Sequence, residues 1–176
     1  MLPQSSMFWC RYDKLIPYYA ERPILVKLAP NVPDIGLASE TAEASGADGL
    51  TLINTMPGLT INVDSQEAEL GAGQGGVSGP ALRAVGVHAV HCASKKTTIP
   101  LVGVGGIMNE YDAIQYLLAG ASLVQVGTAT FADPRSAQET AQGIERFCEN
   151  QGIDSISDLI GAYRKDKKTE GLLGGV

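Results

Sequence analysis

Four short apolar runs alternate with segments of helical periodicity along most of this chain. The runs lie at residues 24–28, 49–53, 101–104 and 123–126, and turn-forming residues separate them from the helical segments. Short apolar runs of this kind are typical of strands buried in a parallel sheet. The alternation predicts an α/β fold of four βα units with parallel strands.

Cap residues place the helices between and after these runs. The predicted helices span about residues 34–45, 80–94, 109–119, 134–152 and 156–160. Asp34 and Asn109 are good N-caps, and Pro80 and Pro134 suit a first helical turn. Two apolar faces are expected: Tyr111, Ile114, Leu117 and Leu118 on the third helix, and Ala137, Ala141, Ile144 and Phe147 on the fourth.

The connection between residues 55 and 79 is far longer than the roughly two to six residues usual in a βα loop. Residues 60–64 alternate like one arm of a hairpin, and several glycines between 71 and 79 permit bends. We predict a long loop or lid at residues 56–78, within a domain that spans residues 24–163. Residues 1–23 carry no clear pattern, and residues 164–176 are expected to form a flexible tail.

Two glycine-rich turns follow the third and fourth apolar runs. Gly105 and Gly106 follow the run at 101–104, and Gly127 with Thr128 follows the run at 123–126. Neighbouring parallel strands end at the same edge of a sheet, so these turns are expected to lie together. Turns without side chains let backbone N–H groups approach an anion closely, which predicts a phosphate site, helped by the start of a following helix.

Polar residues within or after the apolar runs leave alternatives open. Lys27 lies in a run expected to be buried, so it either pairs with a carboxylate or contacts a ligand. Asn54 is either a turn former or a side chain at the ligand-binding edge. His88 and His91 share one predicted helix without a third metal ligand nearby in sequence, which favours a surface or packing role over metal binding.

Length, charge and cysteine usage limit the functional classes. The chain has 176 residues, fewer than the ~250 of a typical (β/α)₈ barrel, and a net charge of −6. This charge argues against nucleic acid or an anionic membrane surface as a partner. No apolar run approaches the ~18 residues of a membrane span, and the three cysteines form neither a CxxC pair nor a disulfide framework. The sequence therefore predicts a cytoplasmic protein.

Five motifs occur in order along residues 23–134. They are VKLAPN (26–31), LTLINT (50–55), GGVSGPA (75–81), VGVGGI (102–107) and VQVGTATF (124–131). Together they closely resemble the C-terminal half of the class 1 dihydroorotate dehydrogenases, most of all the catalytic subunit of the NAD-linked type 1B enzymes. The resemblance implies the C-terminal half of a (β/α)₈ TIM barrel, FMN as cofactor, and oxidation of dihydroorotate to orotate in pyrimidine biosynthesis. It also implies an iron–sulfur FAD electron-transfer subunit as partner.

The resemblance further implies roles for individual residues. Lys27 would contact the flavin near the pyrimidine end of its ring system, where a cation stabilises negative charge. Ile53 and Gly79 would also touch the flavin, and Asn54 with Thr55 would hydrogen-bond the substrate. The FMN phosphate would be held by Gly105, Gly106, Gly127 and Thr128. The resemblance thus favours the ligand roles of Lys27 and Asn54.

The family places its general base, a cysteine in class 1 enzymes, on a loop of the N-terminal half. Cys10, Cys92 and Cys148 fall in no motif that resembles this loop, so we expect no catalytic residue and little turnover by this chain alone. The leading interpretation is the C-terminal portion of a dihydroorotate dehydrogenase. The alternatives are a non-catalytic flavin- or phosphate-binding half-barrel that serves assembly, and a different FMN or phosphate barrel enzyme, which would not explain VKLAPN together with LTLINT.

Four parallel strands leave two open sheet edges, here the runs at 24–28 and 123–126. Both runs are apolar and lack the prolines or clustered charges that protect an exposed edge. The sequence therefore predicts a homo-oligomer.

Overall fold

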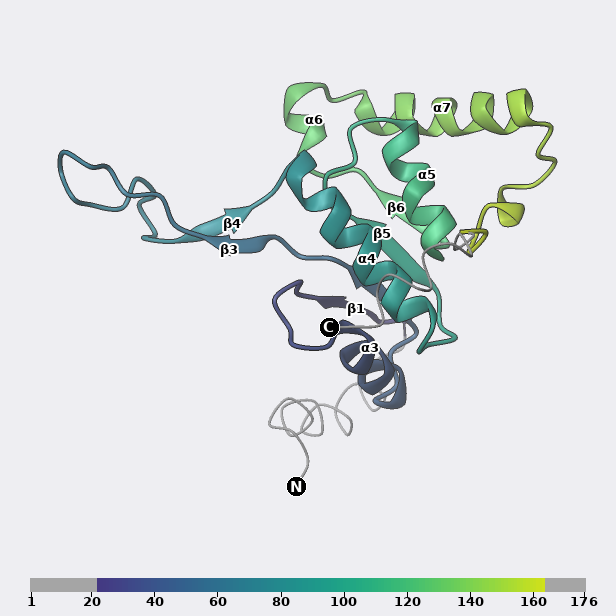
Figure 1. Ribbon diagram of the computed structural model, residues 1–176, viewed down its shortest axis with the longest axis horizontal. Helices are drawn as coiled ribbons and strands as arrows, with labels where there is room; N and C mark the ends of the chain where they lie inside the picture. The colour runs from purple at the N-terminus through teal and green to yellow at the C-terminus, as the bar shows by residue number, and fades with distance from the viewer. Residues whose placement is uncertain (1–21, 164–176) are drawn as a thin grey trace, which may run out of the picture.

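Four parallel strands form the sheet of this protein, in the order β1-β2-β5-β6, in a computed structural model that describes residues 22–163 (Figure 1). The strands are β1 (Leu25–Leu28), β2 (Gly49–Leu52), β5 (Leu101–Val104) and β6 (Leu123–Gln125). In register, Leu28 pairs with Leu52, Leu52 with Gly103, and Gly103 with Val124. The carboxyl ends of all four strands therefore meet at one edge, and the predicted parallel α/β architecture is confirmed.

The helices that connect the strands follow the predicted order, and two of them begin at the expected N-caps, Asp34 and Asn109. The helical elements are α3 (Ile35–Ala44), the 3₁₀ turn η1 (Pro80–Leu82), α4 (Arg83–Ser94), α5 (Glu110–Ala119), α6 (Ala129–Ala132), α7 (Ser136–Gln151) and the 3₁₀ turn η2 (Ile156–Asp158). Asp34 accepts a hydrogen bond from Leu37 N at 2.9 Å, and Asn109 accepts one from Asp112 N at 3.1 Å. Helix α4 packs between α3 and α5, and α5 packs against α7. The core lies between these helices and the sheet.

The expected apolar face of α5 is wrong in part. Tyr111 is 64% exposed, whereas Tyr116 is completely buried. The reason is that Gly103 of β5 and Gly86 of α4 have no side chains. The ring of Tyr116 fills the space of a Cβ on Gly103, and mainly its hydroxyl fills the space of a Cβ on Gly86. Tyr111 instead makes an edge contact with the ring of Phe147 on α7.

The expected face of α7 also needs correction. Ala137 and Ala141 are exposed, and the buried residues are Ser136, Thr140, Gly143 and Ile144. Small residues let α7 approach α5 closely, since a Cβ on Gly143 would lie 2.6 Å from the Cβ of Glu110. The helix expected from Pro134 starts at Ser136 and is preceded by the separate short helix α6.

The long connection after β2 is an antiparallel hairpin that projects from the body of the molecule (Figure 1). Its strands are β3 (Met56–Gly58) and β4 (Gly75–Val77), and a single bridge joins Ile61 to Ala68 farther out. The arm expected at residues 60–64 is therefore limited to that bridge. Both ends of the hairpin return to the carboxyl edge of the sheet. A movement of the hairpin would therefore shift residues at that edge.

The segments predicted at the two ends of the chain lie outside the described residues, except for residues 22 and 23. Within residues 22–163, no helix is long and apolar enough to cross a membrane.

Candidate functional site

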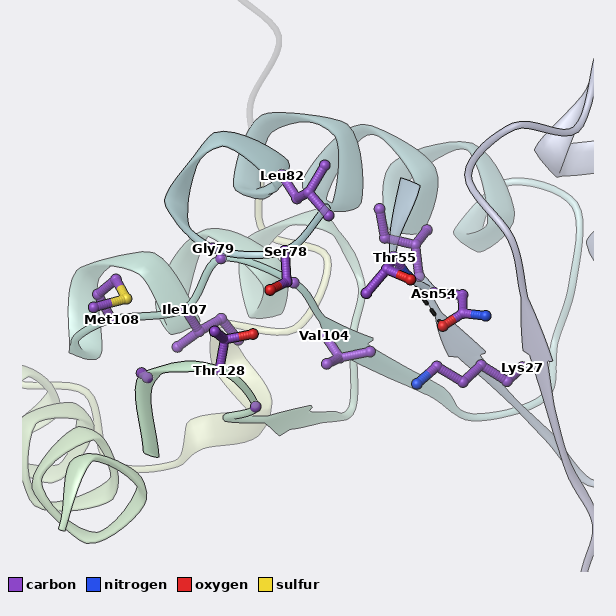
Figure 2. A pocket seen from close by; sticks show the side chains of 15 residues that line it. Lys27, Asn54, Thr55, Ser78, Gly79, Leu82, Val104, Ile107, Met108 and Thr128 are labelled. Carbon is purple, nitrogen blue, oxygen red and sulfur yellow. Dashed lines mark hydrogen bonds between the residues drawn. The ribbon is translucent and has the colours of Figure 1, made fainter. Parts of the chain in front are cut away.

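A pocket of about 150 Å³ lies at the carboxyl edge of the sheet (Figure 2). All nine residues expected in the site line it: Lys27, Ile53, Asn54, Thr55, Gly79, Gly105, Gly106, Gly127 and Thr128. They come from β1, from the segments after β2, β5 and β6, and from the return of the hairpin. The structure therefore brings together residues as far apart in the sequence as Lys27 and Thr128.

Strand pairing fixes the backbone on the β2 side of the pocket. Ile53 N donates to the Val104 carbonyl and Asn54 N donates to the Leu28 carbonyl, both at 2.9 Å. Ile53 is 3% exposed, while Asn54 and Thr55 are exposed at the pocket surface. The amide oxygen of Asn54 accepts a hydrogen bond from Thr55 N at 3.0 Å, drawn as the dashed line in Figure 2. The turn-forming and ligand-binding interpretations of Asn54 are therefore compatible.

The Lys27 side chain is exposed, and no carboxylate within residues 22–163 forms an ion pair with it. The expectation of a buried lysine is wrong because β1 is an edge strand, with a neighbour on one side only. Figure 2 shows the side chain extending from β1 along the carboxyl edge toward Val104. Its ammonium group is thus available to a ligand in the pocket.

The glycines on the opposite side of the pocket adopt backbone conformations that favour glycine. The φ angles of Gly79, Gly105 and Gly106 are 93°, 131° and 68°, in the region that L side chains rarely adopt. A Cβ added at Gly79 or Gly127 would meet nothing within 4 Å. These two glycines therefore leave open space that a ligand atom can fill.

The electrostatics of the pocket favour an anion. Its lining includes the ammonium of Lys27 and no carboxylate among the described residues, although the whole chain carries a net charge of −6. The N–H groups of Gly106 and Thr128 have no hydrogen-bond partner within residues 22–163. Unpaired N–H groups beside side-chain-free turns suit a phosphate. The residues present therefore fit the phosphate end of FMN.

The size of the pocket indicates that these residues would surround only part of such a ligand. Pockets that enclose a whole drug-sized molecule usually measure about 300–1,000 Å³. The 150 Å³ here suits a phosphate and its immediate neighbours. The remaining surface of a bound flavin would have to be covered by other groups.

Six further lining residues were not predicted from the sequence: Ser78, Leu82, Val104, Ile107, Met108 and Ala129. Four of them, Ser78, Val104, Ile107 and Ala129, stand inside the quoted motifs, and that position is a sequence signal for the site. Leu82 and Met108 follow motifs directly or closely and gave no signal of their own. Figure 2 shows the side chains of Ser78 and Thr128 extending into the same space.

The cysteines of the described chain lie away from the pocket. Cys92 is on α4 and Cys148 on α7, both half-buried and unpaired by disulfides, and neither lines the pocket. Cys10 lies outside the described residues. His88 contacts the sulfur of Cys92, and His91 makes an edge contact with Tyr163.

Comparisons with known proteins agree with this arrangement. A sequence profile described as "Dihydroorotate dehydrogenase" matches residues 10–148. The chain is 45% identical over 142 residues to the protein named "Dihydroorotate dehydrogenase B (NAD(+)), catalytic subunit" of Pelobacter propionicus, covering 81% of this chain and 47% of that protein. A protein of the same name from Desulforamulus reducens is 44% identical over 149 residues, covering 85% of this chain and 49% of that protein.

A solved structure shows the same relationship in three dimensions. The dihydroorotate dehydrogenase of Eimeria tenella in complex with ferulenol matches with a TM-score of 0.66 and 30% identity, over 80% of this chain and 38% of that chain. The chain belongs to the dihydroorotate dehydrogenase family. It spans about half the length of the curated relatives it matches, and its sheet corresponds to part of their barrel.

Proposed function

We propose that this chain binds FMN at the pocket and supplies the C-terminal part of the site at which dihydroorotate is oxidised to orotate. One observation carries the proposal. All nine residues to which the family resemblance assigns flavin or substrate contacts line a single pocket. Among the described residues, the unpaired N–H groups and the absence of lining carboxylates support an anionic ligand there.

Each part of the pocket would have a separate task. FMN, when bound, supplies the hydride acceptor that the oxidation requires. Gly105, Gly106, Gly127 and Thr128 would hold its phosphate through backbone N–H groups. Lys27 would place its ammonium beside negative charge on the ring system.

The substrate side of the pocket would be formed by Asn54 and Thr55. Their amide and hydroxyl groups are exposed at the surface and can donate to and accept from a pyrimidine ring. Ile53 and Gly79 would pack against the flavin, one through an apolar side chain and one through its backbone. None of these residues is a suitable base for the proton that leaves with the hydride, because amides, hydroxyls and a lysine ammonium do not readily accept one at neutral pH.

The oxidation also requires a partner that accepts electrons from the flavin. We infer an iron–sulfur FAD subunit as the electron-transfer partner, because the family resemblance implies one and the proteins from Pelobacter propionicus and Desulforamulus reducens are named as catalytic subunits of NAD(+)-type enzymes. Half of such an enzyme is expected to bind cofactor without completing the reaction. A cytoplasmic setting remains a prediction from the sequence.

A binding experiment tests the cofactor site. FMN fluorescence is titrated with the 176-residue chain and with two variants, Lys27→Met in the pocket and Lys95→Met at the end of α4. We expect saturable binding that Lys27→Met weakens about tenfold or more, as for loss of a charge-assisted contact, and that Lys95→Met leaves within about twofold. Absence of saturable binding, or equal effects of the two variants, would contradict the proposed site.

A turnover experiment separates this function from a non-catalytic binding role. Loss of a general base alone typically lowers a rate by ~10²–10⁴-fold, so the isolated chain with FMN should oxidise dihydroorotate at a negligible rate. Addition of a protein that supplies the N-terminal half of a related enzyme should restore turnover if the chain is a catalytic portion. Continued inactivity of an assembled, FMN-loaded complex would favour the binding role.

A further inference from the structure

Three polar side chains lie next to the glycine turns of the pocket without lining it. They are Arg83 at the start of α4, and Asp112 and Tyr116 on α5. Tyr116 bonds to the turn after β5, and Asp112 together with Arg83 joins that turn to the Gly79 turn. None is assigned a contact with flavin or substrate by the proposal above.

Asp112 connects two elements of the pocket wall. It is 3% exposed, and one carboxylate oxygen pairs with the Arg83 guanidinium while the other accepts a hydrogen bond from Met108 N at 2.9 Å. Arg83 follows the Gly79 turn by four residues, and Met108 belongs to the turn after β5. The carboxylate therefore links the return of the hairpin to the glycine turn of β5.

Tyr116 holds the same turn from the side of the helices. Its side chain is fully buried, and its hydroxyl donates a hydrogen bond of 2.6 Å to the Gly105 carbonyl. Burial raises the pKa of the Tyr116 hydroxyl, and nearby Arg83 and Asp112 act on the pKa in opposite directions. The hydroxyl therefore remains a donor throughout the physiological pH range.

The hydrogen bond to the Gly105 carbonyl also determines the direction of the Gly106 N–H group. The Gly105–Gly106 peptide is trans, since Leu52–Ile53 holds the single cis bond of the described chain. In a trans peptide the C=O and the following N–H point in opposite directions. Because the Gly105 carbonyl points to Tyr116, the Gly106 N–H points away from Tyr116, and it has no partner within residues 22–163.

We propose that Tyr116, Asp112 and Arg83 form a positioning unit that aims the Gly106 N–H at the phosphate of the bound cofactor. This inference rests on the proposed function, because it assigns the phosphate to the Gly105–Gly106 turn. Tyr116 sets the orientation of the peptide plane, and the Asp112–Arg83 pair holds the turn against the neighbouring Gly79 turn. Arg83, Asp112 and Tyr116 act through the turn and are positioning residues.

Packing alone does not account for these contacts. A phenylalanine at position 116 would still fill the space beside Gly103, where the carbons of the Tyr116 side chain lie. The hydroxyl adds a contact beside Gly86 and the hydrogen bond to the Gly105 carbonyl, and only the hydrogen bond acts on the turn. The bond from Met108 N closes the first turn of α5 by itself, so the pair with Arg83 adds a link to a different helix. The Tyr116 hydrogen bond is made to the Gly105 turn, and the Arg83–Asp112 pair lies beside the pocket turns.

The test compares Tyr116→Phe with the matched control Tyr111→Phe, which removes a hydroxyl from an exposed residue of the same helix. Affinities for FMN and for riboflavin, which lacks the phosphate, are measured with the full chain. We expect Tyr116→Phe to weaken FMN binding about fivefold, as for loss of one hydrogen bond, and to leave riboflavin binding within about twofold. Tyr111→Phe should change neither affinity.

A second readout follows the turn itself and does not require the cofactor. In the NMR spectrum of the unliganded chain, the backbone order parameter of Gly106 should fall from about 0.85 toward 0.6 in Tyr116→Phe and stay unchanged in Tyr111→Phe. Arg83→Met should lower it too, and Arg83→Lys should restore most of it.

The two readouts separate the two proposals. An unchanged order parameter in Tyr116→Phe would overturn the positioning unit, whether or not FMN binds. An equal loss of FMN and riboflavin affinity would also overturn it, because the effect would not lie at the phosphate. Failure of the wild-type chain to bind FMN, with the order parameter falling as expected, would instead overturn the assignment of the cofactor.

Discussion

A side chain on Gly106 would collide with the backbone of Gly79. An added Cβ would lie 2.8 Å from the Gly79 carbonyl oxygen, and 2.7 Å from Arg83 N. The turn after β5 and the return of the hairpin therefore touch through their backbones at the pocket wall. Contact at this distance requires glycine at position 106 for its lack of a side chain as well as for its φ of 68°.

Gly106→Ala is therefore expected to destabilise the protein. A left-handed conformation costs an L residue about 1–2 kcal/mol, and the collision adds to it, so the free energy of unfolding should fall by roughly 2–4 kcal/mol. Urea unfolding followed by circular dichroism measures this value. A loss below about 0.5 kcal/mol would mean that the two turns separate easily.

Gly127→Ala is expected to behave differently at the same pocket. Its φ does not lie in the left-handed region, and an added Cβ would meet nothing within 4 Å, so stability should stay within about 0.5 kcal/mol of wild type. The methyl group would instead occupy space assigned to the phosphate. FMN affinity should drop by about tenfold or more while riboflavin affinity is kept. Unchanged FMN binding would place the phosphate elsewhere.

The buried Tyr116 predicts a loss of stability at alkaline pH. Below about pH 10 the hydroxyl is protonated in the folded and in the unfolded chain. Above that pH the unfolded chain releases a proton that the folded protein retains, because burial raises the Tyr116 pKa. The free energy of unfolding should therefore fall as the pH rises, by at most about 1.4 kcal/mol per pH unit for this group.

Tyr116→Phe isolates this contribution from the other groups that ionise at high pH. The difference in unfolding free energy between wild type and Tyr116→Phe should be constant between pH 7 and 9 and shift in favour of the variant above about pH 10. Tyr111→Phe serves as control, because Tyr111 is exposed. A difference that stays constant up to pH 11 would contradict a raised pKa.

Part of the pocket could be predicted from sequence because its residues follow strand ends. In a parallel sheet every strand delivers its next residues to one edge, so finding Gly105 and Gly127 after apolar runs was enough to group these two turns, whereas the ligand role of Asn54 came from the family resemblance. The contacts of Tyr116 and Asp112 could not be found in this way. Asp112 pairs with an arginine 29 positions away, and the burial of Tyr116 depends on glycines in two other elements.

The predicted buried face of α7 was wrong for a related reason, because it too depends on contacts with other elements. On α7 the buried side includes Ser136 and Thr140, which an apolar period does not detect, while exposed alanines fit the period. Close packing of α7 on α5 at Gly143 decided which side was buried. The burial of Lys27 was misjudged because its apolar run suggested a buried strand, although residues 24–28 were also expected to form an open edge of the sheet.

The hairpin is expected to move less when the pocket is filled. Its two ends run into Thr55 and Gly79, which line the pocket, while Ile61 and Val63 farther out are 55% and 85% exposed. A segment with little burial opens readily and is stabilised by a ligand held at its base. A glutamate-specific protease should cut at Glu67 and Glu69, and saturating FMN with orotate should slow this cutting about fivefold or more.

Glu149 near the end of α7 provides an internal control for that experiment. It is exposed and does not line the pocket, so its rate of cutting should not respond to either ligand. Equal protection at Glu67 and Glu149 would indicate global stabilisation. Absence of protection at Glu67, with FMN demonstrably bound, would contradict the lid interpretation.

The two edge strands are expected to make the 176-residue chain associate. β1 and β6 end the sheet, and Leu25 and Leu123 on these strands are 55% and 62% exposed. An apolar edge with unpaired backbone groups is a template for pairing with another chain, at ~25 cal/mol for each Å² of apolar area buried. Equilibrium sedimentation at micromolar concentration should therefore report a mass above the 18.4 kDa of one chain.

A charged substitution on an edge strand tests whether the chain associates through the edges of its sheet. Leu123→Lys places a charge on β6 and should shift the protein toward the monomer, as lysines do on natural edge strands. Leu37→Lys is the matched control, because Leu37 is 44% exposed and belongs to helix α3, not to either edge strand. It should leave the mass unchanged. A wild-type monomer that unfolds cooperatively, or equal dissociation by both variants, would show that the edges of this sheet do not drive assembly.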